Sequence, residues 1–144
     1  MKNILVTINF DGNENLLLDK AFQLAKSFGS KIWLLHIAAP DPDFVGYEAG
    51  PQDIRDSRAA ELRKEHRLIQ EYSSGLKAKG VDSESLLIQG ATIEMIIEES
   101  KKLHIDLIIA GHHEHGFFYN AFVGSVSAKI IKKSKIPVLL VPLE

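Results

Sequence analysis

The chain has 144 residues, 45% hydrophobic and 25% charged, with a formal net charge of −2. Length and composition are typical of a globular protein, and we expect a single domain over residues 1–144. The charge gives no electrostatic reason to expect nucleic-acid or membrane partners, and the lack of cysteine excludes disulfides, thiolate catalysis and cysteine-ligated metal centres.

The first half of the chain alternates strand and helix patterns. Ile4–Ile8 is a β-branched run expected for a strand that is buried on both faces of a parallel sheet. Glu14–Phe28 repeats apolar side chains at helical spacing and is followed by Gly29, which is typical of a helix C-cap. A second strand is expected over Lys31–Ala38. After a loop rich in proline and glycine, Asp53–Lys79 predicts a long charged helix.

The second half continues the alternation and ends on a strand. Glu84–Ile88 predicts a strand, Ala91–Leu103 a helix and Asp106–Ala110 a fourth strand. Ala121–Lys133 predicts the last helix, and Ile136–Val141 the fifth strand. With right-handed crossovers, this order predicts an α/β fold: an open, doubly wound parallel sheet with helices on both faces. No segment resembles a signal peptide or a membrane span, so we expect a cytoplasmic location.

Three loops are expected to meet at the carboxyl edge of this sheet, where such folds bind ligands. They are Asn9–Asn13, Ile37–Gly50 and Gly111–Gly124. The last one joins a buried strand to a helix, so backbone N–H groups and a helix N-terminus are aimed at the edge, as phosphate binding requires. The chain contains neither a P-loop nor a Gly-x-Ser-x-Gly nucleophile elbow.

Motifs spread over nearly the whole chain resemble the universal stress protein family. The third loop matches the family's nucleotide loop, Gly-x2-Gly-x9-Gly-Ser/Thr, at Gly111, Gly124 and Ser125. Leu34–Ile37 matches the family's Leu-Leu-His-Val, and Lys135–Pro142 matches its closing Lys-x-Pro-Val-Leu-Val-Val-Pro. The resemblance implies the five-stranded, adenine nucleotide alpha hydrolase-like fold.

The resemblance also implies a site for ATP or AMP, with or without Mg²⁺. Adenine would lie near Asn9 and the backbone of Ile37, and the Ser125 hydroxyl would donate to phosphate. Phosphate and ribose would also meet backbone groups of the third loop. The implied nucleotide-binding residues are Thr7, Asn9, Ile37, Gly111, Glu114, Gly124, Ser125 and Val126.

Two of these positions depart from the family motif. Glu114 stands where the loop has its middle glycine, and it adds bulk and a carboxylate close to an anionic triphosphate. Asn9 replaces the usual aspartate but still offers an acceptor and a neutral donor. Two functions therefore stay open: a stress-response regulatory module that binds adenine nucleotide, and a nucleotide-free homodimeric interaction module. A third is a slow ATP hydrolase in which Asp11 or Glu114 orients water, but catalysis is not expected.

Histidines gather around Glu114 and raise the hypothesis of a metal site. His112, His113 and His115 lie in one short stretch. Zinc needs three or four converging ligands, whereas neighbouring residues of an extended segment point to opposite sides. We therefore expect solvated loop histidines and no metal. His36, at the end of the second strand, is expected to pack against the loop above it and not to act as a base.

The aromatic stretch that follows suggests a surface for a partner. Phe117–Phe122 places four aromatic side chains beside the implied site. Core packing under the loop accounts for Phe122, and the other aromatic side chains would be partly exposed, which suits a partner surface or a lid over a ligand. Of the two, we expect residues 115–122 to form a contact surface for another protein.

The C-terminal strand is expected at an edge of the sheet, where exposed apolar residues invite pairing. The resemblance implies that two such edges pair across a two-fold axis, so we expect a homodimer. Its interface would comprise Pro137, Val138, Leu139, Leu140 and Val141.

Overall fold

A computed structural model describes residues 1–10, 12–38, 52–89, 93–112, 130 and 132–143. They form the expected parallel sheet, five-stranded and in the order β3-β2-β1-β4-β5. The strands are β1 (Asn3–Thr7), β2 (Lys31–Ala38), β3 (Ser83–Gln89), β4 (Leu107–His112) and β5 (Val138–Pro142). The helices are α1 (Glu14–Phe28), α2 (Gln52–Ala78) and α3 (Ile93–Lys102). The α/β, doubly wound fold is confirmed.

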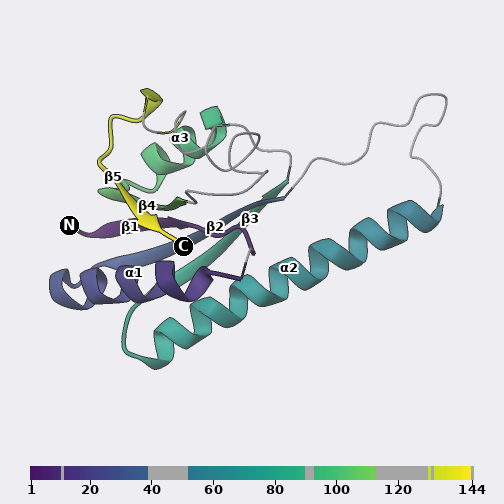
Figure 1. Cartoon of the computed structure of the whole chain (residues 1–144), viewed down its shortest axis with the longest axis horizontal. Coiled ribbons are helices and arrows are strands. Elements are labelled where there is room, and N and C mark those ends of the chain that lie inside the picture. Colours follow the sequence, from purple (N-terminus) through teal and green to yellow (C-terminus); the bar gives the residue numbers. More distant parts are fainter. Residues whose placement is uncertain (11, 39–51, 90–92, 113–129, 131, 144) are drawn as a thin grey trace.

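Helices cover both faces of the sheet, as Figure 1 shows, with α1 and α2 on one face and α3 on the other. Apolar side chains of the strands fill both interfaces because a parallel sheet between helices is buried on both sides. The core on the α1 and α2 face includes Ile4, Val6, Ile8, Leu17, Ala21, Ile32, Leu34, Ile69 and Ile109. The core on the α3 face includes Leu5, Leu35, Ile96, Ile105, Ile108 and Ile130.

Local signals place the boundaries of α1. Helix α1 has the predicted bounds, and Gly29 caps it in the left-handed region with a φ of 67° and its N–H bonded to the carbonyl of Ala25. The apolar spacing continues as far as Phe28, but that side chain is 58% exposed. Helical periodicity does not reveal that the core no longer covers the last turn.

At the amino edge of the sheet, Asp106 contacts the start of the chain. The sequence predicts that Asp106 begins the fourth strand, but it lies directly before that strand. Its carboxylate Oδ2 accepts the backbone N–H groups of Lys2 at 2.7 Å and Asn3 at 3.0 Å. The hydrogen bond from Asn3 has the larger effect and the one from Lys2 the smaller, and together they hold the pKa of the Asp106 carboxyl below its usual value. The carboxylate thereby ties the start of β1 to the start of β4.

In the C-terminal part the strands β4 and β5 occur as predicted, but their bounds differ from the predicted ones by one or two residues. Strand β5 lies at an edge of the sheet, as expected, and begins directly after Pro137. Residues 130, 132 and 133 are helical, and the rest of the predicted helix Ala121–Lys133 lies outside the described residues. None of the helices, as far as the chain is described, is long and apolar enough to cross a membrane.

Candidate functional site

The carboxyl ends of β1, β2 and β4 lie side by side at one edge of the sheet. Strand order reverses here, because β1 pairs with β2 on one side and with β4 on the other. Thr7 lies opposite Leu35, and Val6 lies opposite Ile109. This edge is where an open α/β sheet offers a ligand site.

Asn9 and Thr7 stand at this edge with polar groups available. Asn9 is exposed, and its side chain makes no hydrogen bond to any of the described residues. The Thr7 hydroxyl has one acceptor within the described part of the chain, the Ile109 carbonyl at a long 3.5 Å. Both side chains could therefore exchange hydrogen bonds with a ligand at little cost.

Ile37 can contribute only its backbone to a ligand. Its side chain packs partly buried against the core beneath α3. It is in register with Ile88 of β3, near the carboxyl end of β2. This placement agrees with the expectation that the backbone, not the side chain, of Ile37 would meet a ligand.

Gly111 has a packing reason to be glycine. A Cβ built on it would lie 2.4 Å from Cδ1 and 3.1 Å from Cγ of Leu143, which is buried in the core beyond β5. The φ of Gly111 is not positive, so the close approach and not backbone conformation opposes a side chain here, because Leu143 would have to shift to admit one. The first glycine of the loop motif is therefore explained without a ligand.

A polar contact that the sequence did not predict lies beneath the edge. The His36 ring is buried, with Nδ1 2.6 Å from the carbonyl oxygen of Ile8 and Nε2 3.2 Å from Oε2 of Glu65. The Phe10 ring lies 4.5 Å from it between centroids. The loop that follows β2, against which His36 is expected to pack, lies outside the described residues. Among the described residues the ring packs against Phe10 of the loop after β1, and α2 supplies a partner that chain order does not reveal.

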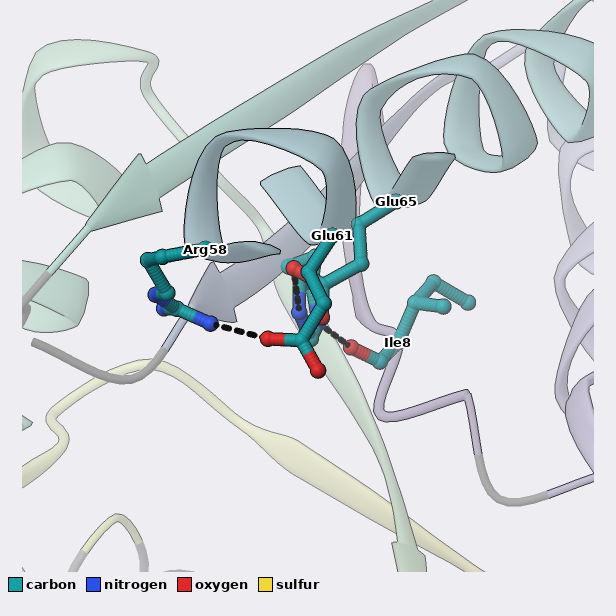
Figure 2. Close-up of polar contacts among 5 residues, drawn as sticks. Ile8, Arg58, Glu61 and Glu65 are labelled. Atoms are coloured by element: carbon teal, nitrogen blue, oxygen red, sulfur yellow. Dashed lines mark hydrogen bonds and ion pairs between the residues drawn. The ribbon is translucent and has the colours of Figure 1, made fainter. Parts of the chain in front are cut away.

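Helix α2 forms a wall beside the edge. Figure 1 shows that its N-terminal turns extend past the ends of the strands. Arg58 pairs there with Glu61, Nη1 to Oε2, at 3.0 Å, one turn before Glu65 meets β2 (Figure 2). The Arg58 side chain is only 14% exposed whereas that of Glu61 is 67% exposed, so the ion pair lies at the surface with its arginine held against the molecule.

Several expected site residues lie outside the described part of the chain. They are Glu114, Gly124, Ser125 and Val126, the loop histidines His113 and His115, the side chain of His112, and the aromatic stretch 115–122. Asp11 is likewise outside it. Among the residues that are described, no three His, Cys, Asp or Glu side chains come together as a metal site.

Known proteins resemble this chain along its length. The profile of the Universal stress protein family matches residues 1–142. Universal stress protein C of Escherichia coli O157:H7 is 34% identical over 145 residues, covering 98% of this chain and 95% of the relative. Among solved structures, universal stress protein UspA from Lactobacillus plantarum has a TM-score of 0.79 at 16% identity, covering 97% of each chain. A family protein from Arabidopsis thaliana with AMP bound has a TM-score of 0.63 at 21% identity, covering 100% of this chain and 93% of that one.

Proposed function

The chain belongs to the universal stress protein family, and from that premise we propose that residues 1–144 form one domain, a stress-response regulatory module that binds an adenine nucleotide. One observation carries this proposal: β1, β2 and β4 end together where strand order reverses. A ligand at this edge meets strand-end backbone groups and polar side chains at once. The AMP-bound relative from Arabidopsis thaliana has the same fold, which makes AMP a natural first probe.

The proposed contacts divide between the two ends of the nucleotide. The Asn9 amide and the backbone of Ile37 meet the adenine edge, with the Thr7 hydroxyl nearby. These groups lie side by side because β1 and β2 are adjacent strands that end at the same edge of the sheet. Phosphate and ribose meet the loop that follows β4. The proposed residues there are Gly111, Gly124, Ser125 and Val126, and Glu114 opposes the phosphates through its charge.

Calorimetric titration with AMP and with ATP, each with and without Mg²⁺, tests the proposal. We expect saturable binding that Asn9→Ala weakens by about tenfold through the loss of hydrogen bonds to the base. Asn15→Ala, an exposed asparagine on α1, is the matched control and should bind as the native protein does. Glu114→Gly should tighten ATP more than AMP, because ATP carries more negative charge. No heat and no thermal shift at millimolar nucleotide would contradict nucleotide binding.

A second candidate is a nucleotide-free interaction module, and Gly111 favours it. Its contact with Leu143 explains the glycine without a ligand, and Glu114 fills the place of the next motif glycine. In this case the stretch 115–122 contacts a protein partner. If titration of the native protein with nucleotide gives no heat of binding, and the Glu114→Gly variant does bind nucleotide, this candidate is supported.

We further propose a homodimer formed by antiparallel pairing of two β5 strands. Leu139 on this edge strand is 37% exposed, and an apolar edge is stabilised by a second strand. Light scattering should give about twice the monomer mass of 16.0 kDa. Leu139→Lys should give monomers, whereas Leu16→Lys, at a 45% exposed leucine of α1, should stay dimeric. A native monomer at micromolar concentration would contradict the dimer.

The same proposal covers turnover and location. The protein signals through occupancy of its site and not through catalysis, acts in the cytoplasm, and has no nucleic-acid or membrane partner. Phosphate release above the blank that Ser125→Ala abolishes would instead identify a slow ATP hydrolase.

A further inference from the structure

His36 joins three elements at the base of the candidate site. It belongs to β2, its Nδ1 faces the Ile8 carbonyl at the end of β1, and its Nε2 faces Glu65 of α2. The ring is 7% exposed and the Glu65 side chain 26%, so water competes little for the contact. Figure 2 shows the dashed contacts that Glu65 and the Ile8 carbonyl make.

Counting donors and acceptors assigns a proton to this contact. A carbonyl oxygen only accepts, so Nδ1 must carry a hydrogen and donate it to Ile8. In a neutral imidazole Nε2 is then a bare acceptor, yet it lies 3.2 Å from a carboxylate oxygen, which also only accepts. Two acceptors attract each other only when a proton lies between them.

The surroundings of His36 contain few competing charges. On α2, Glu61 is engaged by Arg58, and Tyr72 stacks on Phe10 at 6.4 Å. Burial above all, and then Glu14 and Glu71, raises the pKa of the Tyr72 phenol, which therefore stays neutral at physiological pH.

The remaining neighbours come from the other elements around His36. On α1, the Glu14 carboxylate accepts the backbone N–H of Gly12 at 3.2 Å. On β3 the residue in register with His36 is the uncharged Leu87. Within the described residues, Glu65 is thus the carboxylate that contacts the ring.

We propose that His36 and Glu65 share one proton, and that this shared proton makes His36 a positioning residue for Asn9. The bonded carbonyl belongs to Ile8, the residue directly before Asn9. Phe10, directly after it, has a φ of 56°, a left-handed conformation that a phenylalanine rarely adopts, and its ring lies against His36. The two neighbours of Asn9 are thus both held by His36.

The consequence is a candidate site whose geometry depends on pH. With the proton present, α2, β2 and the end of β1 are joined in one hydrogen-bonded chain. When the proton is removed, the lone pair of Nε2 faces the negative carboxylate, and the Glu65 side chain turns away from His36. The loop around Asn9 then loses its support from below.

The Glu65→Gln variant tests the shared proton alone, because glutamine has nearly the same shape as glutamate. A glutamine N–H donates to the bare Nε2 of a neutral imidazole, so the same chain of contacts forms without the shared proton. Glu61→Gln is the matched control, since it removes a carboxylate one turn earlier that pairs with Arg58 and not with His36. Neither exchange alters the volume of the helix face.

The test follows the ring nitrogens of His36 and the backbone amide of Asn9 by nitrogen-15 NMR, from about pH 5.5 to about pH 9. We expect both ring nitrogens to be protonated at the acid end, and the Asn9 amide to move at the same midpoint as Nε2. Glu65→Gln should show a still Asn9 amide throughout, whereas Glu61→Gln should follow the native protein. An unprotonated Nε2 at the acid end, or an Asn9 amide that stays still while Nε2 titrates, would overturn the inference.

The relevance of this device to a ligand rests on the proposed function, and a second measurement separates the two. AMP affinity measured at both pH extremes should fall severalfold with rising pH in the native protein and stay level in Glu65→Gln. Failure to bind AMP at either pH would count against the proposed function alone, because the NMR result decides the shared proton without any nucleotide. Binding with the same pH dependence in both proteins would overturn the role in positioning.

Discussion

The contact between Gly111 and Leu143 leads to the sharpest prediction about this fold: Gly111→Ala destabilises the native protein, and the same change becomes stabilising once Leu143 is shortened. The alanine Cβ would lie 2.4 Å from Leu143 Cδ1, whereas carbon atoms pack at about 3.5–4.0 Å. The overlap exceeds an ångström, so the leucine must leave its rotamer or the chain after β5 must shift.

The magnitudes follow from packing. Overfilling a packed core costs about 1–3 kcal/mol, which is the loss expected for Gly111→Ala. Leu143→Ala alone should cost about 2–5 kcal/mol, because Leu143 is buried in the core. In that background the space is empty, and the φ of Gly111 suits any residue. Alanine should then stabilise by about 0.4–1 kcal/mol, because it restricts the unfolded chain.

Urea denaturation of the four proteins of this double-mutant cycle measures the effect. Gly75→Ala is the matched control, because a Cβ at Gly75 of α2 meets nothing within 4 Å. It should stabilise by about 1 kcal/mol in both backgrounds, as glycine does poorly inside a helix. If Gly111→Ala had the same sign in both backgrounds, the close approach of Leu143 would not be the reason for this glycine.

Three further predictions concern other contacts of the fold. Asp106→Asn should lower the free energy of unfolding at neutral pH. Because the native pKa of this carboxyl is depressed, the difference in stability between the native protein and the variant should shrink as pH falls below about 4. A pH-independent difference in urea titrations would contradict this. Ser83→Ala should cost about 1–3 kcal/mol in urea, because the buried Ser73 hydroxyl then loses the acceptor it bonds at 3.0 Å, and adding Ser73→Ala should recover part of the loss; full additivity would refute the pairing. Gly29→Ala should lower stability by about 1–2 kcal/mol, since a φ of 67° is strained for alanine, and an unchanged urea midpoint would show that the cap relaxes.

Much of the fold could be predicted because its signals are local. Glu14–Phe28 and Lys31–Ala38 have the predicted bounds, since apolar spacing and a capping glycine act over a few residues. The bounds of the other elements differ from the predicted ones by one or two residues, and at the start of β4 a distant contact intervenes. Asp106 reads as the start of a strand, yet its carboxylate bonds the backbone of Lys2 and Asn3 at the other end of the chain.

The candidate site could be predicted in outline only. Strand–helix alternation was enough to predict that the loops after β1, β2 and β4 share one edge, and the structure brings Thr7, Asn9, Ile37 and Gly111 to that edge. The partner of His36 could not be predicted. Glu65 lies 29 residues away on a helix whose other charged residues look alike in sequence.

By itself, the sequence determined the order of helices and strands, the parallel α/β sheet and the family, because these depend on local periodicity and on motifs that each lie within a few residues. Only the tertiary structure decided what Gly111 and His36 do. Their partners, Leu143 and Glu65, come within reach only after β4 has paired with β5 and α2 has packed across the sheet. Close approach and proton sharing are properties of distances between elements, and no local pattern encodes those distances.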